Sequence, residues 1–238
     1  MQGMFNGVNF NSIDLSAWNF SNVHNYNFMF GSCWNLNDLK LSDNFGCVAQ
    51  NAQSLFSNVP LTDIVISNFN PDVTNVNNMF ENCYNLTMVS FPNNFGRNAM
   101  EFWGLFSQCW NLNTINGSIN VGNIPYDQWA NYQTIFIYSP EEDRYNNIRY
   151  LVLNDFGKYD DGMEGRTIEI RAKYWGADNR QCVIDSLVNN SFDRTSMAMP
   201  TLTINFYNDY VDFTTEELNI LGAKGYTLNK YTTGNKGI

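Results

Sequence analysis

Basic residues are scarce in this 238-residue chain: 13 lysines and arginines stand against 23 aspartates and glutamates, for a formal net charge of −10. Nucleic-acid backbones and anionic lipid headgroups attract basic protein surfaces and repel acidic ones. The charge balance therefore argues against nucleic-acid binding and against an anionic membrane surface. Only 15% of the residues are charged, so asparagine, serine and threonine must supply much of the polar surface.

Long apolar segments are also missing. No run approaches the roughly 18 apolar residues of a membrane-spanning helix. The first ten residues, MQGMFNGVNF, contain no basic segment followed by an apolar one, which is the pattern of a signal peptide. We therefore predict no membrane insertion and no signal peptide at this N-terminus.

The residues from which catalytic and metal sites are usually built are few. His24 is the only histidine, and the five cysteines have no CxxC spacing, so no zinc site and no histidine-based triad is predicted. No nucleotide-binding glycine motif occurs, and the acidic clusters at 141–143, 160–161 and 209–212 lack EF-hand spacing. We predict no catalytic residue, no metal and no cofactor. A carboxylate pair for glycoside hydrolysis depends on tertiary geometry and stays open.

What the sequence does contain is a repeat of about 25 residues. A Met-Phe or Leu-Phe pair recurs in five copies, with steps of 25, 26, 24 and 26 residues. Other positions keep the same step, including a short alternating segment that predicts one strand in each copy of a parallel sheet. The phenylalanine of each pair is Phe5, Phe30, Phe56, Phe80 or Phe106, and the first inward residue of each predicted strand is Ile13, Leu39, Ile64, Val89 or Ile115.

Three cysteines occupy one position of this repeat. Cys33, Cys83 and Cys109 each follow the phenylalanine of the pair by three residues, and Val8 and Val59 hold the same position in the other two copies. Because valine substitutes for cysteine there, we interpret the position as a slot for a small apolar side chain. His24 is interpreted as a corner residue between repeats.

The pattern MF-x-x-C-x-x-L-x-x-[ILV]-x-[LIF] over residues 4–125, with SNFNPDVTNVNNMF (67–80) as its clearest copy, resembles the BspA-type leucine-rich repeat of bacterial and phage surface proteins. The resemblance implies an α/β repeat fold: a leucine-rich-repeat solenoid with a parallel sheet, about five regular coils and a C-terminal α/β cap. We expect the array at 1–125, an irregular coil with inserted strands and a loop at 126–178, and the cap at 179–238.

Beyond the array the sequence predicts strands at 148–153 and 167–173 joined by a long hairpin connection, then a helix within 180–192 and a strand at 201–206. A capping box of Thr214 and Glu217 heads a further helix that ends at Gly222 or Gly225 and leads into a last short strand. This ending is similar to the closing segment of leucine-rich-repeat proteins of phages and gut bacteria, which implies a cap over the stack.

Two rows of side chains are candidate binding surfaces. One is the outward-facing residue of each predicted strand, and the other is an aromatic residue directly after each slot cysteine, suited to stacking on sugars or on partner proteins. Packing along the edge of the repeat is the alternative for the aromatic row. The strand row comprises Asp14, Lys40, Val65, Ser90 and Asn116, and the aromatic row comprises Trp34, Tyr84 and Trp110.

The function that the sequence favours is a non-catalytic binding or assembly module, in a phage virion as a tail or fibre-associated protein. The expected partners are other virion subunits or a host surface protein or glycan, with a partner or preceding domain covering the first repeat and a homo-oligomer as a further option. A bacterial cell-surface adhesin is the alternative, and a depolymerase of surface glycans is the second alternative.

Overall fold

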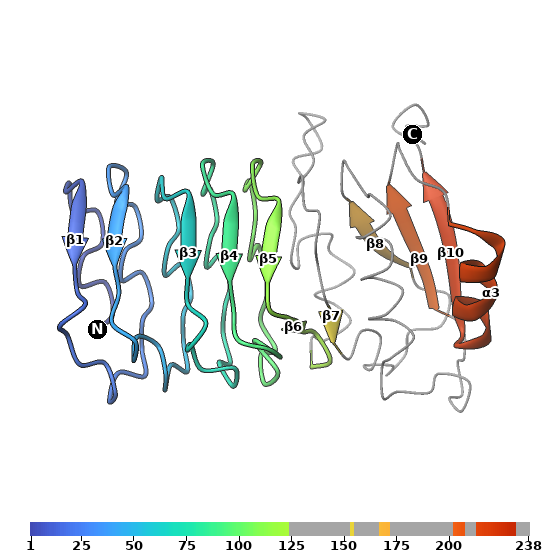
Figure 1. Cartoon of the computed structure of the whole chain (residues 1–238), viewed down its shortest axis with the longest axis horizontal. Helices are drawn as coiled ribbons and strands as arrows, with labels where there is room; N and C mark the ends of the chain where they lie inside the picture. Colours follow the sequence, from blue (N-terminus) through green and yellow to red (C-terminus); the bar gives the residue numbers. More distant parts are fainter. Residues whose placement is uncertain (124–152, 155–166, 172–201, 208–212, 232–238) are drawn as a thin grey trace.

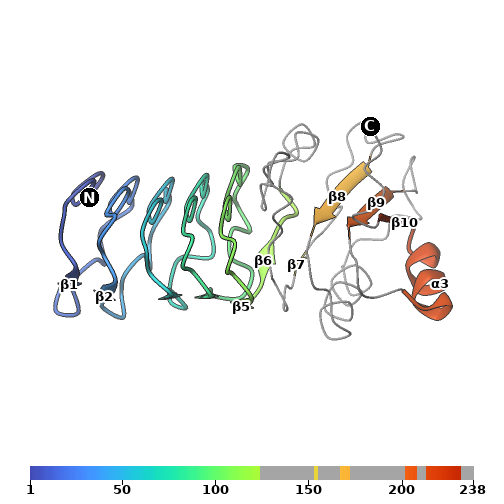
Figure 2. The same ribbon diagram turned by 90° about the horizontal axis from the view of Figure 1, so that it is seen from above.

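The computed structural model describes residues 1–123, 153–154, 167–171, 202–207 and 213–231. Residues 1–123 form a row of repeats that lie side by side along the long axis of the molecule (Figures 1 and 2). Each repeat contributes one strand of three residues. These strands are β1 (Ser12–Asp14), β2 (Asp38–Lys40), β3 (Asp63–Val65), β4 (Met88–Ser90) and β5 (Thr114–Asn116).

The strands pair in parallel, one from each repeat, as the periodicity predicts. Ile13 pairs with Leu39 across β1 and β2, and Val89 pairs with Ile64 on one side and Ile115 on the other. The central residue of each strand points inward, since side chains alternate between the two faces of a strand. The prediction of a leucine-rich repeat with parallel strands is confirmed.

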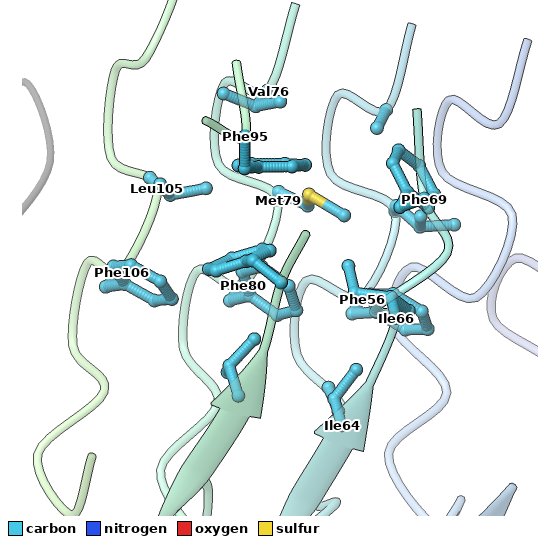
Figure 3. Close-up of a cluster of buried hydrophobic side chains, with 14 of the residues drawn as sticks. Phe56, Ile64, Ile66, Phe69, Val76, Met79, Phe80, Phe95, Leu105 and Phe106 are labelled. Atoms are coloured by element: carbon cyan, nitrogen blue, oxygen red, sulfur yellow. The ribbon is translucent and has the colours of Figure 1, made fainter. Parts of the chain in front are cut away.

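A ladder of phenylalanines forms the wall opposite the strands. The rings of Phe5, Phe30, Phe56, Phe80 and Phe106 stack face to face, with successive centroids 5.6, 5.6, 5.6 and 5.4 Å apart. Figure 3 shows Phe56, Phe80 and Phe106 in this row beside the inward strand residue Ile64. The four rings from Phe30 onward are completely buried. Each repeat thus buries its aromatic side chain against the next, which a single repeat could not do alone.

The slot cysteines do more than fill space, which extends the interpretation from sequence. The thiols of Cys33, Cys83 and Cys109 each donate a 3.0 Å hydrogen bond to the carbonyl of a phenylalanine in the ladder of the preceding repeat, which is Phe5, Phe56 or Phe80. All three cysteines are buried, and burial raises the pKa of the Cys33 and Cys109 thiols. The three thiol hydrogen bonds link neighbouring repeats.

The corners between repeats are built from asparagine and from main-chain hydrogen bonds. Asn58, Asn82 and Asn94 adopt left-handed backbone conformations with φ of 61°, 60° and 58°, which asparagine tolerates better than most residues. His24 lies exposed at such a corner, where its carbonyl accepts hydrogen bonds from the amides of Gln50 (2.8 Å) and Asn51 (3.1 Å). This agrees with its interpretation as a corner residue.

One expectation about the sheet is wrong. The sequence predicted a single parallel sheet through all repeats, but β1 and β2 form one two-stranded sheet and β3, β4 and β5 form a separate three-stranded sheet. Figure 1 shows β2 and β3 farther apart than the other neighbouring strands of the row. The interruption lies between Leu39 and Ile64, and its cause is given with the site below.

The C-terminal part adds two small parallel sheets. β6 (Ile119–Asn120) pairs with β7 (Leu153–Asn154), and β8 (Thr167–Arg171), β9 (Leu202–Tyr207) and β10 (Tyr226–Tyr231) form a sheet in the order β10-β9-β8. The predicted strands at 167–173 and 201–206 are confirmed as β8 and β9, whose bounds differ from the predicted ones by at most two residues. The predicted hairpin between 148–153 and 167–173 is wrong, because β7 and β8 lie in different sheets and each pairs in parallel.

The predicted capping box is present. Helix α3 (Thr215–Ala223) begins after Thr214, whose hydroxyl accepts a 3.2 Å hydrogen bond from the Glu217 amide while the Glu217 carboxylate accepts one of 2.6 Å from the Thr214 amide. The chain leaves the helix through Gly225, at φ 84°, and enters β10 beside it (Figure 1). The predicted helix within 180–192 and the expected domain boundaries at 125/126 and 178/179 lie outside the described residues.

Candidate functional site

The outward residues of the five strands lie on one face, and all of them except Ser90 are exposed or partly exposed. Lys40 Nζ lies 3.6 Å from the Asp14 carboxylate, and both side chains are exposed. Two hydrogen bonds from Ser16 to that carboxylate, together with the nearby Lys40 ammonium, hold the pKa of Asp14 below its usual value. This end of the row is therefore a solvated ion pair.

Ser90 does not belong to an exposed surface, which corrects the prediction. Only 9% of Ser90 is exposed, and its hydroxyl accepts a 3.0 Å hydrogen bond from the amide of Asn116 in the next repeat. Asn116 remains exposed, and Val65 is 60% exposed. The row is therefore discontinuous, with an apolar side chain at its centre.

The aromatic row is partly exposed. Trp34 is 61% exposed and Tyr84 is 43% exposed, with the Tyr84 hydroxyl donating a 3.2 Å hydrogen bond to the Gln108 side chain. Trp110 is half-buried. The first and third repeats have Asn9 and Pro60 directly after the slot residue, in place of an aromatic residue. Trp34 therefore has no aromatic residue of this row in either neighbouring repeat.

The most distinctive feature of the row of repeats is a groove between β2 and β3. It encloses about 330 Å³, close to the lower end of the range for small-ligand pockets, and both strands line it. Its apolar lining includes Leu39, Leu41, Phe45, Leu61, Ile64 and Ile66, and its acidic lining consists of Asp43 and Asp63. Asp63 begins β3 and Asp43 follows β2, so the two residues lie toward opposite ends of the groove. The Asp63 carboxylate accepts hydrogen bonds from the hydroxyls of Thr62 (3.3 Å) and of Thr87 in the next repeat (3.1 Å).

Main-chain groups on both walls of this groove have no strand partner. The Lys40 carbonyl accepts from Leu15, and the Ile66 amide donates to Ser90, so these groups point away from the groove. Main-chain groups alternate in direction along a strand, which turns the amides and carbonyls of Leu39 and Leu41 toward β3, and those of Asp63 and Val65 toward β2. None of these groups has a main-chain hydrogen bond within residues 1–123.

Three links that join other neighbouring repeats are missing at this junction. The first is a main-chain bond at the strand entry: Asn37 donates to the Asn11 carbonyl at 2.9 Å and Thr87 donates to the Thr62 carbonyl at 2.7 Å, whereas within residues 1–123 Thr62 makes no equivalent bond to Asn37. The second is the thiol bond, because Val59 takes the slot of the third repeat.

The third missing link is an asparagine side chain. Asn35 donates its side-chain amide to the Asn9 side chain of the first repeat, and Asn111 donates to the Tyr84 carbonyl at 2.6 Å. The third repeat has Pro60 in this turn, and proline offers neither a side-chain amide nor a main-chain N–H. With all three links absent, β3 does not pair with β2.

The second and third repeats remain joined along the opposite wall. The amides of Tyr26, Phe28 and Phe30 donate to the carbonyls of Asn51, Gln53 and Leu55 at 2.8, 2.9 and 3.0 Å. At the far end of the strands, the Asn68 side chain donates to the Asp43 carbonyl at 3.1 Å. The opening is therefore a wedge in the strand wall of an otherwise joined pair of repeats.

Sequence reasoning missed the groove, although a signal was present. The distance from the slot residue to the first inward strand residue is five positions in the first and third repeats and six in the others. Only at the third repeat does a short turn follow a long one, and only there does the turn contain proline. The irregular step and Pro60 together mark the interrupted junction.

The described residues also bear on metal binding and on membrane insertion. No group of three or more histidine, cysteine, aspartate or glutamate side chains in the described part of the chain is placed to hold a metal ion. Within the same residues, no helix is long and apolar enough to cross a membrane. The arrangement of exposed apolar, aromatic and main-chain groups is suited to binding.

The repeats match a known protein family. The BspA type Leucine rich repeat region matches residues 1–135 in six copies, which is more than half of the chain. Comparison with curated proteins and with solved structures finds no match.

Proposed function

The chain belongs to the BspA-type leucine-rich-repeat family, and from that premise we propose that it is a non-catalytic protein-binding module of a phage virion, in a tail or fibre-associated position. Such a repeat suggests a protein-binding surface module that is typically extracellular and not catalytic. The virion assignment draws on the resemblance of TLTI followed by TEELNILGAKGYTL to the closing segments of leucine-rich-repeat proteins of phages and gut bacteria. In this proposal the repeats form a solenoid whose C-terminal residues act as its cap.

The observation that carries the binding function is the exposed strand face with its neighbouring aromatic side chains. Val65 and Trp34 are among the most exposed large apolar side chains, at 60% and 61%. Aromatic side chains provide large contact area at small entropic cost, and exposed apolar residues are enriched where partners bind. The proposed partners are other virion subunits, or a protein or glycan on the host surface.

A second contact is proposed at the first repeat. Met4, Val8 and Trp18 are exposed there, at 47%, 41% and 38%, and Phe5 and Phe10 are only partly buried. A partner subunit, a neighbouring domain or a second copy of the chain would remove this apolar surface from water.

The location is tested by immunogold electron microscopy with antibodies against the full chain. The proposal expects gold on the tails or fibres of virus particles from cultures that express the gene. Gold confined to bacterial envelopes would support the adhesin alternative and refute the virion role. Gold on neither particles nor cells would refute both.

The binding surface is tested with three matched variants. We expect Trp34→Ala and Lys40→Glu to weaken adsorption of the labelled chain to particles or cells, whereas Trp103→Ala should not. Trp103 is a fair control because it is an aromatic side chain of similar exposure, 51%, in a different row of the repeat. Unchanged adsorption by all three variants would place the binding surface elsewhere. Release of new reducing ends from host polysaccharide would favour the depolymerase alternative over a non-catalytic role.

A further inference from the structure

The groove between β2 and β3 offers hydrogen-bonding groups on both of its walls. Neighbouring strands of a parallel sheet lie about 4.8 Å apart and share a ladder of main-chain bonds, but here β2 and β3 belong to separate sheets. The main-chain groups of Leu39 and Leu41 face those of Asp63 and Val65 across the opening. Strand edges of this kind are templates for pairing with another extended segment.

The floor and the ends of the groove define the chemistry of its occupant. Ile64 and Ile66 are almost completely buried at the floor, and Leu39 and Leu41 are partly buried against the same core. The side chains of an inserted strand alternate in direction, so every second one would meet this apolar floor. Asp43 and Asp63 place a negative charge toward each end of the groove, in a chain whose net charge is −10.

We propose that this groove binds one extended segment of a partner protein, in which aliphatic side chains alternate with small polar ones and a lysine or arginine stands at each end. The segment fills the place of a strand between β2 and β3 and bonds to both walls. It deepens the protein-binding function proposed above and rests on it. The acidic ends distinguish this occupant from a second copy of the chain pairing through β1, β2 or β3, because each of these strands contains an aspartate: Asp14, Asp38 or Asp63.

The probe is the capped peptide KSVSVSK, with two controls: ESVSVSE reverses the end charges, and KSPSPSK removes two main-chain donors. Isothermal titration calorimetry with the full chain should detect KSVSVSK and neither control. Amide hydrogen exchange gives an independent readout: the amides of Leu39, Leu41, Asp63 and Val65 should exchange fast in the free protein and become protected by the peptide. Absence of KSVSVSK binding at millimolar concentration, or binding without protection of these amides, overturns the proposal.

A variant that closes the groove provides the second test. Replacing Val59 and Pro60 by the Cys-Trp-Asn sequence of residues 33–35 restores the thiol, the asparagine and the longer turn. This closed variant should lose affinity for KSVSVSK by about tenfold or more, and its Val65 amide should become protected without peptide. The matched control makes the same replacement at Val8 and Asn9, which lie outside the groove, and should bind as the natural chain does. Unchanged binding by the closed variant overturns the proposal.

A charge exchange keeps the test valid if the closed variant does not fold. Asp43→Lys leaves intact the main-chain carbonyl that Asn68 bonds. It should weaken KSVSVSK roughly two- to fivefold and give ESVSVSE measurable binding, since each exposed ion pair contributes a small amount. If Asp43→Lys changes the affinity for neither KSVSVSK nor ESVSVSE, the requirement for acidic ends is wrong.

Adsorption to particles or cells separates this inference from the proposed function. If the closed variant still adsorbs as the natural chain does, the groove inference fails while the protein-binding function stands. If the natural chain does not adsorb at all, the proposed function fails, even where the peptide binds. Concentration-dependent dimers that vanish in the closed variant would assign the groove to a second copy and overturn the partner segment.

Discussion

The phenylalanine ladder gives the sharpest stability prediction. Phe56 stands at its middle, completely buried, with Phe30 and Phe80 stacked on its two faces at 5.6 Å. Truncation of a buried phenylalanine to alanine generally lowers the free energy of unfolding by about 3–5 kcal/mol. We place Phe56→Ala in the upper part of this range, because two aromatic contacts are lost together with the buried area.

The prediction is checked by urea denaturation followed by far-ultraviolet circular dichroism. With a denaturant slope of about 2 kcal/mol per M, the midpoint of the Phe56→Ala variant should fall by roughly 2 M. Total stabilities are usually about 5–15 kcal/mol, so this loss is a large fraction of the whole.

Two matched variants separate stacking from the loss of an aromatic residue as such. Phe5→Ala should have roughly half the effect, because Phe5 is only partly buried and has one ring of the ladder beside it, Phe30. Trp34→Ala should change the midpoint little, because Trp34 is 61% exposed. If Phe56→Ala and Trp34→Ala were equally mild, the buried ladder could not be what holds the repeats together.

Three further predictions concern single residues. Burial raises the pKa of Glu81 above its usual 4.5, so the fold disfavours the carboxylate and loses stability as the pH rises through and above 4.5. Glu81→Gln should therefore raise Tm at pH 7 and leave it nearly unchanged at pH 4; an equal rise at both would rule out the carboxylate charge as the cause. Gly117→Ala should lower the free energy of unfolding by about 2 kcal/mol or more, from left-handed backbone strain together with a steric clash. Gly117 has φ 90°, and a Cβ there would lie 2.4 Å from the Phe91 carbonyl oxygen. The control Gly7→Ala has φ 70° with no atom within 4 Å of its Cβ, so an equal loss in urea denaturation would show that strain alone accounts for both. Thr214→Ala removes the capping box of α3 and should cost about 1 kcal/mol, seen as faster amide exchange in the first turn of that helix; unchanged exchange would mean that the cap contributes nothing.

Local and periodic features of the fold could be predicted because each depends on residues that lie close together in the sequence or recur at a fixed step. The position of each strand, its inward residue and the buried phenylalanine follow from the period and from side-chain alternation. The capping box follows from the spacing of Thr214 and Glu217. Predicting these features did not require knowing which repeats contact one another.

Features of the candidate site could be predicted only in part, since they depend on how two repeats meet. Ser90 has the position of an exposed strand residue, yet Asn116 of the next repeat covers it with a hydrogen bond. The strands predicted at 148–153 and 167–173 were expected to form a hairpin, but β7 and β8, which overlap these segments, each pair in parallel with another strand.

The sequence alone determined that this chain is a BspA-type repeat with a phenylalanine wall facing a wall of short strands, because burial at a fixed step is a property of each repeat by itself. Only the tertiary structure decided that the strand wall opens between β2 and β3. Pairing there requires donors and acceptors from two repeats to meet at about 3 Å. A turn that is one residue shorter and contains Pro60 keeps these groups apart, although every repeat still buries its own core.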